Sequence, residues 1–158
     1  MRHIFNAGFV CQYVRSATPK AIMSTMPRRF DHIDLRVSSL AEVRPFYQAL
    51  LPALGFTRDA KIEGWLQYET PDSPVSEFFG VTESPGHTPN ENRIAFRAES
   101  RTEVDRLFEV AVRAGAHNVE GPAFETPGYY AIFFDDPCGN RFEICHRTKL
   151  QPNEPVNT

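Results

Sequence analysis

The stretch that decides the fold is HIDLRVSSLAEVRPFYQALLPALGF, residues 32–56, because RIAFRAESRTEVDRLFEVAVRAGA, residues 93–116, repeats its pattern. The offset between the two copies is about sixty residues, and in both an alternating segment changes to helical spacing at the same place. The identical pairs are Ile33 with Ile94, Arg36 with Arg97, Glu42 with Glu103, Val43 with Val104, and Ala53 with Ala114. A fixed period of this kind predicts a duplicated module of strand, helix and further strands.

The first copy predicts one strand, one helix and two more strands. Residues 30–37 alternate between apolar and polar side chains, which is typical of a half-buried strand. Ser38 or Ser39 can cap the helix that follows, with Glu42 completing a capping box, and Gly55 ends it. Residues 64–70 and 75–83 are predicted strands joined by a turn at 71–74, and the loop 84–92 leads into the second copy.

The second copy repeats this order. It predicts a strand at 93–98, a helix that ends at Gly115, a turn at Gly121 and Pro122, and strands at 129–134 and 141–146. We therefore predict an α+β fold of two βαβββ modules, residues 30–84 and 92–148, that form a curved, mostly antiparallel sheet around a concave pocket. One short strand in each module is expected to escape the pattern.

Strand alternation divides these residues between two faces. The apolar positions, such as Ile33 and Phe142, face the helices, and the ionisable positions face the other way. The residues on that opposite face are His32, Asp34, Arg36, Arg93, Ala95, Arg97, Arg141, Glu143 and Cys145. Ionisable groups gathered on one side of a sheet predict a binding or catalytic site.

Charge and composition limit the partners. The chain has 158 residues and 41% apolar content, enough for one domain with a core. Its net charge is −3, and the acid-free first 29 residues carry five basic side chains, so the remainder carries −8. An acidic body argues against nucleic acid and leaves a neutral or cationic small ligand open. Cys11, Cys138 and Cys145 have no metal spacing and suit a reducing compartment, so we expect a cytoplasmic protein without membrane spans.

The two ends of the chain are predicted to lie outside the domain. Residues 1–29 are a disordered or mis-started extension with translation from Met26, a packed arm, or an organelle presequence, and the sequence leaves all three open. Residues 149–158 contain two prolines among mostly polar side chains and are expected to form a frayed tail.

Four segments carry a resemblance to a known family. They are FDHIDLRV at 30–37, Phe46 and Tyr47 before LLPALGF, NRIAFRA at 92–98, and YYAIFFDDPCGNRFEI at 129–144. The chain resembles the vicinal oxygen chelate superfamily, which includes glyoxalase I, extradiol dioxygenases, fosfomycin-resistance enzymes and bleomycin-binding proteins. The resemblance covers most of residues 30–147 and implies paired βαβββ modules that enclose a pocket.

The resemblance also implies metal ligands. His32 matches the ligand on the first strand and Glu143 matches the carboxylate on the last strand. Glu83 is a third candidate, because it follows Gly55 at the same spacing as Glu143 follows Gly115. The divalent metal would be zinc, nickel, manganese or iron, but the histidine expected at the fourth position is Arg93, which has no lone pair for a metal.

Arg93 leaves two functions open. In the first, a metal or Arg93 stabilises negative charge while Glu143 or His32 moves a proton, as in a lyase, isomerase or dioxygenase. In the second, the protein binds a small molecule without metal, as bleomycin-binding proteins do. Asp34, Arg36, Arg97 and Tyr130 are expected to contact the ligand in either case. A homodimer is expected, because family members commonly pair through these modules. A third possibility is a vestigial pocket in a dimerisation or regulatory domain.

Overall fold

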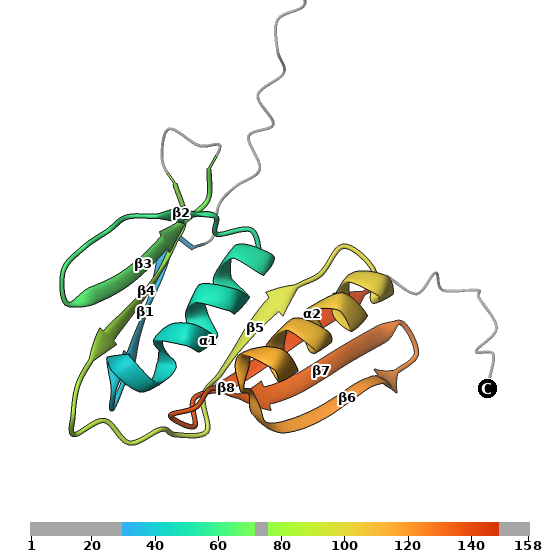
Figure 1. Ribbon diagram of the computed structural model, residues 1–158. Coiled ribbons are helices and arrows are strands. Elements are labelled where there is room, and N and C mark those ends of the chain that lie inside the picture. The colour runs from blue at the N-terminus through green and yellow to red at the C-terminus, as the bar shows by residue number, and fades with distance from the viewer. Residues whose placement is uncertain (1–29, 72–75, 149–158) are drawn as a thin grey trace, which may run out of the picture.

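A computed structural model describes residues 30–71 and 76–148 (Figure 1). The first module contains β1 (His32–Val37), α1 (Leu40–Ala53), β2 (Arg58–Asp59), β3 (Trp65–Glu69) and β4 (Phe78–Glu83). The second contains β5 (Arg93–Arg97), α2 (Arg101–Ala114), β6 (His117–Thr126), β7 (Tyr129–Asp135) and β8 (Arg141–Arg147). The predicted termini at 1–29 and 149–158, and most of the predicted turn at 71–74, lie outside the described residues.

The strands form two four-stranded sheets, where we had predicted one. The first sheet has the order β1-β4-β3-β2 and the second has the order β5-β8-β7-β6. In each, the first and last strands of the module pair in parallel and the other pairs are antiparallel. The predicted α+β fold of two βαβββ modules is therefore confirmed, with β2 and β6 as the strands that the pattern did not show.

The sequence pattern did not predict strand β6, because the strand contains turn-forming residues. Gly121 and Pro122, which predicted a turn, lie inside β6, where the pairing with β7 shifts register. Gly121 has φ 89°, and a Cβ there would come 2.6 Å from the carbonyl oxygen of Ala131. A side chain at this position would clash, so glycine lets the strand bulge and continue.

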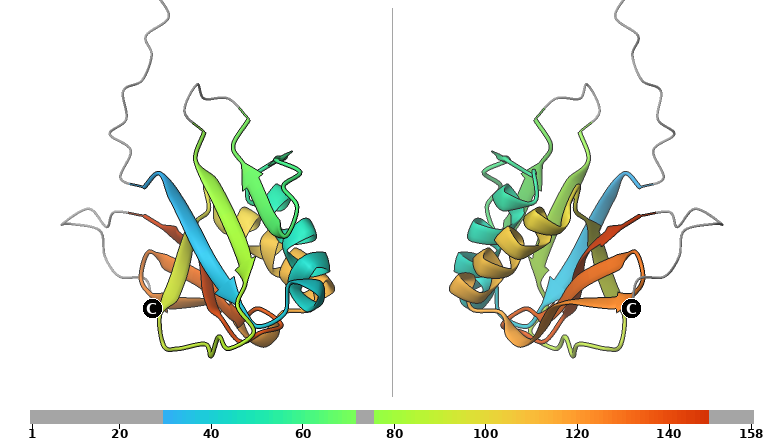
Figure 2. Two further views of the ribbon diagram at one scale, coloured as in Figure 1. Left: turned by 90° about the vertical axis from the view of Figure 1, so that its left-hand side faces the viewer. Right: turned by 90° about the vertical axis from the view of Figure 1, so that its right-hand side faces the viewer.

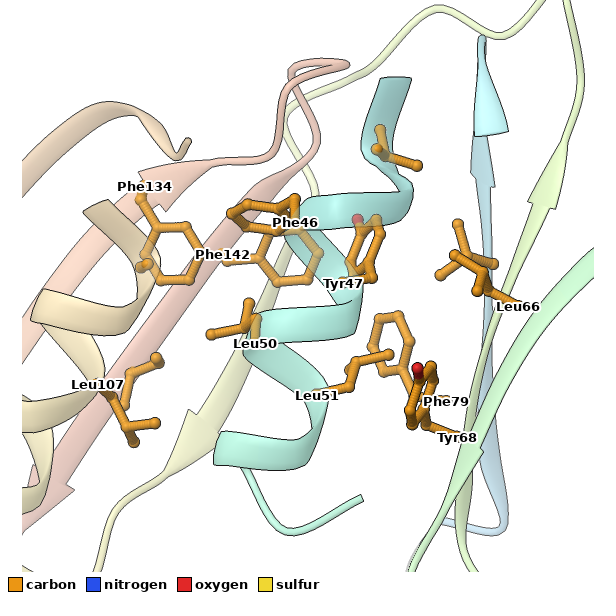
Figure 3. Packing of buried hydrophobic residues seen from close by; sticks show 14 of the residues in the cluster. Phe46, Tyr47, Leu50, Leu51, Leu66, Tyr68, Phe79, Leu107, Phe134 and Phe142 are labelled. Carbon is orange, nitrogen blue, oxygen red and sulfur yellow. The ribbon is translucent and has the colours of Figure 1, made fainter. Parts of the chain in front are cut away.

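The helices pack against each other on one side of both sheets (Figure 2). Aromatic side chains from both modules fill the core between the helices and the sheets, including Phe46, Tyr47, Phe79 and Phe142 (Figure 3). The ring of Phe79 on β4 lies 5.9 Å from that of Phe96 on β5 and 6.4 Å from that of Phe142 on β8. Since the helix-facing sides of the two sheets meet in one core, their outer faces point away from it.

A tight turn fixes the modules to each other. Asp136 is fully buried and accepts a 2.5 Å hydrogen bond from the hydroxyl of Tyr47 on α1. The side chain of Asn140 donates to the carbonyl of Arg36 at the end of β1, at 3.1 Å. The turn between β7 and β8 therefore ties the second module to the start of α1, which sets the relative position of the two sheets.

Candidate functional site

The outer face of the second sheet collects four arginines around one buried glutamate. Arg93 and Arg97 on β5 lie opposite Arg141 and Cys145 on β8, and Ala95 lies opposite Glu143. On the other side of β8, Phe133 pairs with Glu143, Ala131 with Cys145, and Tyr129 with Arg147. We call the set Arg93, Arg97, Arg141, Glu143 and Arg147 the arginine face.

Glu143 is held in place by its neighbours within the arginine face. It is only 6% exposed although its strand position faces outward. Its carboxylate accepts a short hydrogen bond from the hydroxyl of Tyr129 and lies 3.8 Å from the guanidinium of Arg147, which stacks on the Tyr129 ring at 4.1 Å. Burial, followed by the hydrogen bond to Glu143, raises the pKa of Tyr129; burial and then Glu143 also raise the pKa of Cys145. Both groups therefore stay protonated at neutral pH.

Arg93 does not pair with Glu143. Its guanidinium lies over the ring of Phe133, 4.6 Å from the ring centre, and lines a cavity of about 470 Å³ that Arg141 also lines. Within residues 30–71 and 76–148, Arg93, Arg97 and Arg141 form no ion pair. Their guanidinium donors are thus available to an anion from outside the chain.

The outer face of the first sheet carries aromatic rings instead. His32 on β1 stacks on Phe78 of β4, with ring centres 4.4 Å apart and planes within 2°. The indole of Trp65 on β3 meets Phe78 edge to face at 6.2 Å and lies directly over Gly80, where a Cβ would come 2.7 Å from its Nε1. We call His32, Trp65 and Phe78 the aromatic shelf.

Strand register shows which positions of the two modules correspond. Asp34, two residues after His32, pairs with Gly80, and Ala95, two residues after Arg93, pairs with Glu143. His32 thus corresponds to Arg93, and Gly80 corresponds to Glu143. The position in the first module that matches the Glu143 carboxylate is a glycine covered by an indole ring.

Glu83, the expected third ligand, lies at the opposite end of its strand from the aromatic shelf. It pairs with Val37, whereas His32 pairs with Phe78. Its carboxylate accepts a 2.7 Å hydrogen bond from the backbone N–H of Leu40, the first residue of α1. Glu83 therefore caps a helix, and the structure does not bring it to His32 or Glu143.

The expected ligand-contacting residues are divided between the faces. Asp34 and Arg36 lie on the outer face of the first sheet and form an ion pair with each other. Arg97 lies on the arginine face beside a smaller cavity of about 210 Å³. Tyr130 lies on the helix side, where its hydroxyl donates to Asp105 of α2, so the outward position belongs to Tyr129.

Adjacent residues of a strand face opposite sides, and the structure turns Tyr129 outward where we expected Tyr130. Phe134 and Phe142 are buried in the core, so counting back from Phe134 places Tyr130 on the helix side. The roles of Trp65 and Arg147 had no sequence signal, because they depend on the neighbouring strands.

The residues present do not fit the metal that the resemblance implied. His32 and Glu143 lie on outer faces that point away from a common core, and no group of three potential ligands forms within the described part of the chain. The position that corresponds to Glu143 in the first module holds Gly80, and the position that corresponds to His32 in the second module holds Arg93. Neither residue supplies a metal-binding side chain. Even if two copies combined their faces, only His32 and Glu143 would remain of the four positions, and catalytic sites use about three protein ligands.

A family model described as the glyoxalase/bleomycin resistance protein/dioxygenase superfamily matches residues 29–144. The chain belongs to this superfamily. A glyoxalase/bleomycin resistance protein from Albidiferax ferrireducens T118 is 27% identical over 75% of this chain and 98% of its own, with a TM-score of 0.62. No curated protein matches the sequence.

Solved structures with lower sequence identity share the fold. The fosfomycin resistance protein FosX from Mesorhizobium loti is 18% identical over 74% of this chain and 90% of its own, with a TM-score of 0.55. TnmS3, an antibiotic binding protein from Streptomyces sp. CB03234, is 22% identical over 77% and 97%, with a TM-score of 0.52. No helix among the described residues has the length and apolar character to cross a membrane.

Proposed function

We propose that the protein binds a small molecule without a metal, in a site that two copies of the chain build together. The aromatic shelf of one copy would form one wall and the arginine face of the other copy would form the opposite wall. The observation that carries this proposal is the pair of replacements at corresponding positions: Arg93 for a metal-binding histidine and Gly80, under Trp65, for a carboxylate.

The proposed homodimer rests on the position of the two faces. Each face has the features of half a site, and within one chain both point away from the shared core. A closed pair related by a twofold axis would place the first sheet of each copy against the second sheet of the other. Such a pair contains two equivalent sites, each with His32 from one chain and Arg93 and Glu143 from its partner.

The charges in the two faces support binding without metal. Arg147 and the hydroxyl of Tyr129 already engage the Glu143 carboxylate, and Arg93 brings a permanent positive charge to the same face. A divalent cation would have to compete with these groups and would be repelled by the guanidinium groups.

Two further observations agree with the proposal. One neighbour of the same fold, TnmS3, is an antibiotic binding protein. The thiols of Cys138 and Cys145 are both free, as in the cytoplasmic protein that we propose.

Metal content tests the proposal. The protein is purified without a metal-chelating tag, analysed for zinc, nickel, manganese and iron, and heated in the presence of each ion. We expect substoichiometric metal and no rise in Tm with any ion. Near-stoichiometric metal that is lost in both His32→Ala and Glu143→Ala would contradict the proposal and favour a metal-dependent lyase, isomerase or dioxygenase. Glu109→Ala, at an exposed acidic residue of α2 on the helix side of the sheets, is the control.

A further inference from the structure

We propose that the ligand is a planar, unsaturated organic anion, with its negative group between Arg93 and Arg141 and its flat part on the aromatic shelf. This inference rests on the proposed function, because it uses the arginine face of one copy and the aromatic shelf of the other. It adds the chemical class of the ligand. It differs from the neutral or cationic ligand that the net charge of the chain left open.

The anionic group is inferred from unused donors. Arg93 and Arg141 are exposed neighbours on paired strands and line the same cavity, and neither has an ion-pair partner in the described ranges 30–71 and 76–148. The guanidinium of Arg93 lies over the ring of Phe133, a favourable cation–π contact. Guanidinium groups bind carboxylates and phosphates through paired, charge-assisted hydrogen bonds.

Acidic residues also line this cavity, and they restrict where the anion can lie. Asp135 accepts a 2.7 Å hydrogen bond from Asn118, which occupies one side of its carboxylate, and Glu120 lies beside Phe133 on β6. Both line the cavity on the β6–β7 side; Asp135 is the cross-strand partner of Arg141 on β8, and Arg93 lies one strand further away on β5. A ligand anion is therefore expected on the β5–β8 side of the cavity, toward the open edge of the sheet.

The planar part is inferred from the aromatic shelf. His32 and Phe78 form a parallel stack, and the side chain of His32 remains 46% exposed. Trp65 presses one edge of its indole against Gly80, and its buried Nε1 has no hydrogen-bond partner in the structure. A buried donor without a partner is uncommon and lowers stability. Partly exposed rings of this kind bind flat unsaturated groups by stacking.

The test uses 2-naphthoate as the probe with two matched compounds. 2-Naphthamide keeps the rings and removes the charge, and decahydronaphthalene-2-carboxylate keeps the charge and removes the flat rings. Binding is measured by calorimetry on the full chain, and contact with the shelf by the indole N–H resonance of Trp65, which is the single tryptophan of the chain. We expect 2-naphthoate to bind about tenfold or more tightly than either analogue and to shift that resonance. Replacing 2-naphthoate by 2-naphthyl phosphate distinguishes a carboxylate from a phosphate as the preferred anion.

Variants locate the site. Arg93→Ala and Arg141→Ala are each expected to weaken 2-naphthoate binding about tenfold or more, whereas Arg113→Ala, at an exposed arginine of α2, is not. Any of three results would overturn the inference. They are equal affinity for 2-naphthoate and 2-naphthamide, a Trp65 resonance that does not shift, and wild-type affinity in both Arg93→Ala and Arg141→Ala. If the protein is dimeric and metal-free but does not bind 2-naphthoate, only the inferred ligand class is overturned. Stoichiometric metal in the wild-type protein would overturn the proposed function.

Discussion

Two buried carboxylates, each bonded to a tyrosine hydroxyl, join the modules and fix the side chains of the site. Tyr47 is fully buried between the modules, and its hydroxyl satisfies the buried carboxylate of Asp136. Glu143 is satisfied in the same way by Tyr129. In both pairs the tyrosine hydroxyl is one of the donors that allow a carboxylate to be buried, because an unpaired buried charge would cost several kcal/mol. Asp136 also accepts from the backbone N–H groups of Cys138 and Asn140 and from the Asn140 side chain.

The pair of Tyr47 and Asp136 predicts an alkaline loss of stability. Burial, then the charge and hydrogen bond of Asp136, raises the pKa of Tyr47 well above its ordinary value of 10.0. The folded state therefore keeps a proton that the unfolded state releases above pH 10, so the free energy of unfolding falls as the pH rises through 10. Tyr47→Phe is expected to be less stable by about 1–3 kcal/mol at pH 8 and to approach the wild type above pH 10.

Urea unfolding of both proteins at pH 8, 10 and 11 measures this difference. Tyr130→Phe serves as the comparison: the hydrogen bond to Asp105 also raises the pKa of Tyr130, but this pair lies near the surface, so a smaller change with pH is expected. A stability difference between Tyr47→Phe and the wild type that stays constant across this pH range would contradict the account.

At the scale of elements, Glu83 shows how a strand and a helix support each other. The last residue of β4 supplies the acceptor for the first backbone N–H of α1, while Ser39 accepts from the N–H of Glu42 at 3.3 Å. Only the serine half of the predicted capping box is seen, and Glu83 supplies a second acceptor. A negative side chain at this place also opposes the positive end of the helix dipole.

Substitution of Glu83 separates helix capping from a role in the site. Glu83→Ala is expected to lower the free energy of unfolding by about 1 kcal/mol, because the N–H of Leu40 loses its acceptor. Glu83→Gln keeps an acceptor oxygen and is expected to lose less. Chemical unfolding and 2-naphthoate calorimetry of both variants check this prediction, since affinity should match the wild type. Weaker ligand binding with unchanged stability would instead place Glu83 in the site.

Sequence periodicity predicted most elements but could not predict their register. β1, α1, β5 and α2 have clear patterns, whereas β2 has two residues, too few for a period. Equal spacing from the helix-ending glycines aligned Glu83 with Glu143, but hydrogen-bond pairing aligns Gly80 with Glu143. The connections between strands differ in length between the two modules, whereas the hydrogen-bond register of the paired strands is the same. Counting residues along the chain therefore does not locate a carboxylate on the sheet.

The arrangement of the whole molecule separates the two halves of the site. Sequence alternation correctly placed His32, Arg93 and Glu143 on outer faces, but it could not show that these faces belong to two sheets with a shared core. The helices and the turn that carries Asp136 hold the sheets with both faces outward. The central claim is therefore that His32 of one copy meets Arg93 and Glu143 of another.

Zinc binding in a mixed dimer tests this claim most directly. One chain carries Glu143→Ala, and the other carries His32→Ala together with Arg93→His. The chains are coexpressed with two different tags that do not chelate metal, and the mixed dimer is isolated through both. An imidazole introduced at position 93 would join Glu143 of its own chain and His32 of the other, which makes three ligands in one of the two sites.

We predict one zinc ion for each mixed dimer and substoichiometric zinc in each of the two parent homodimers. Absence of zinc from the mixed dimer, or stoichiometric zinc in the His32→Ala/Arg93→His homodimer alone, would contradict a site shared between two copies.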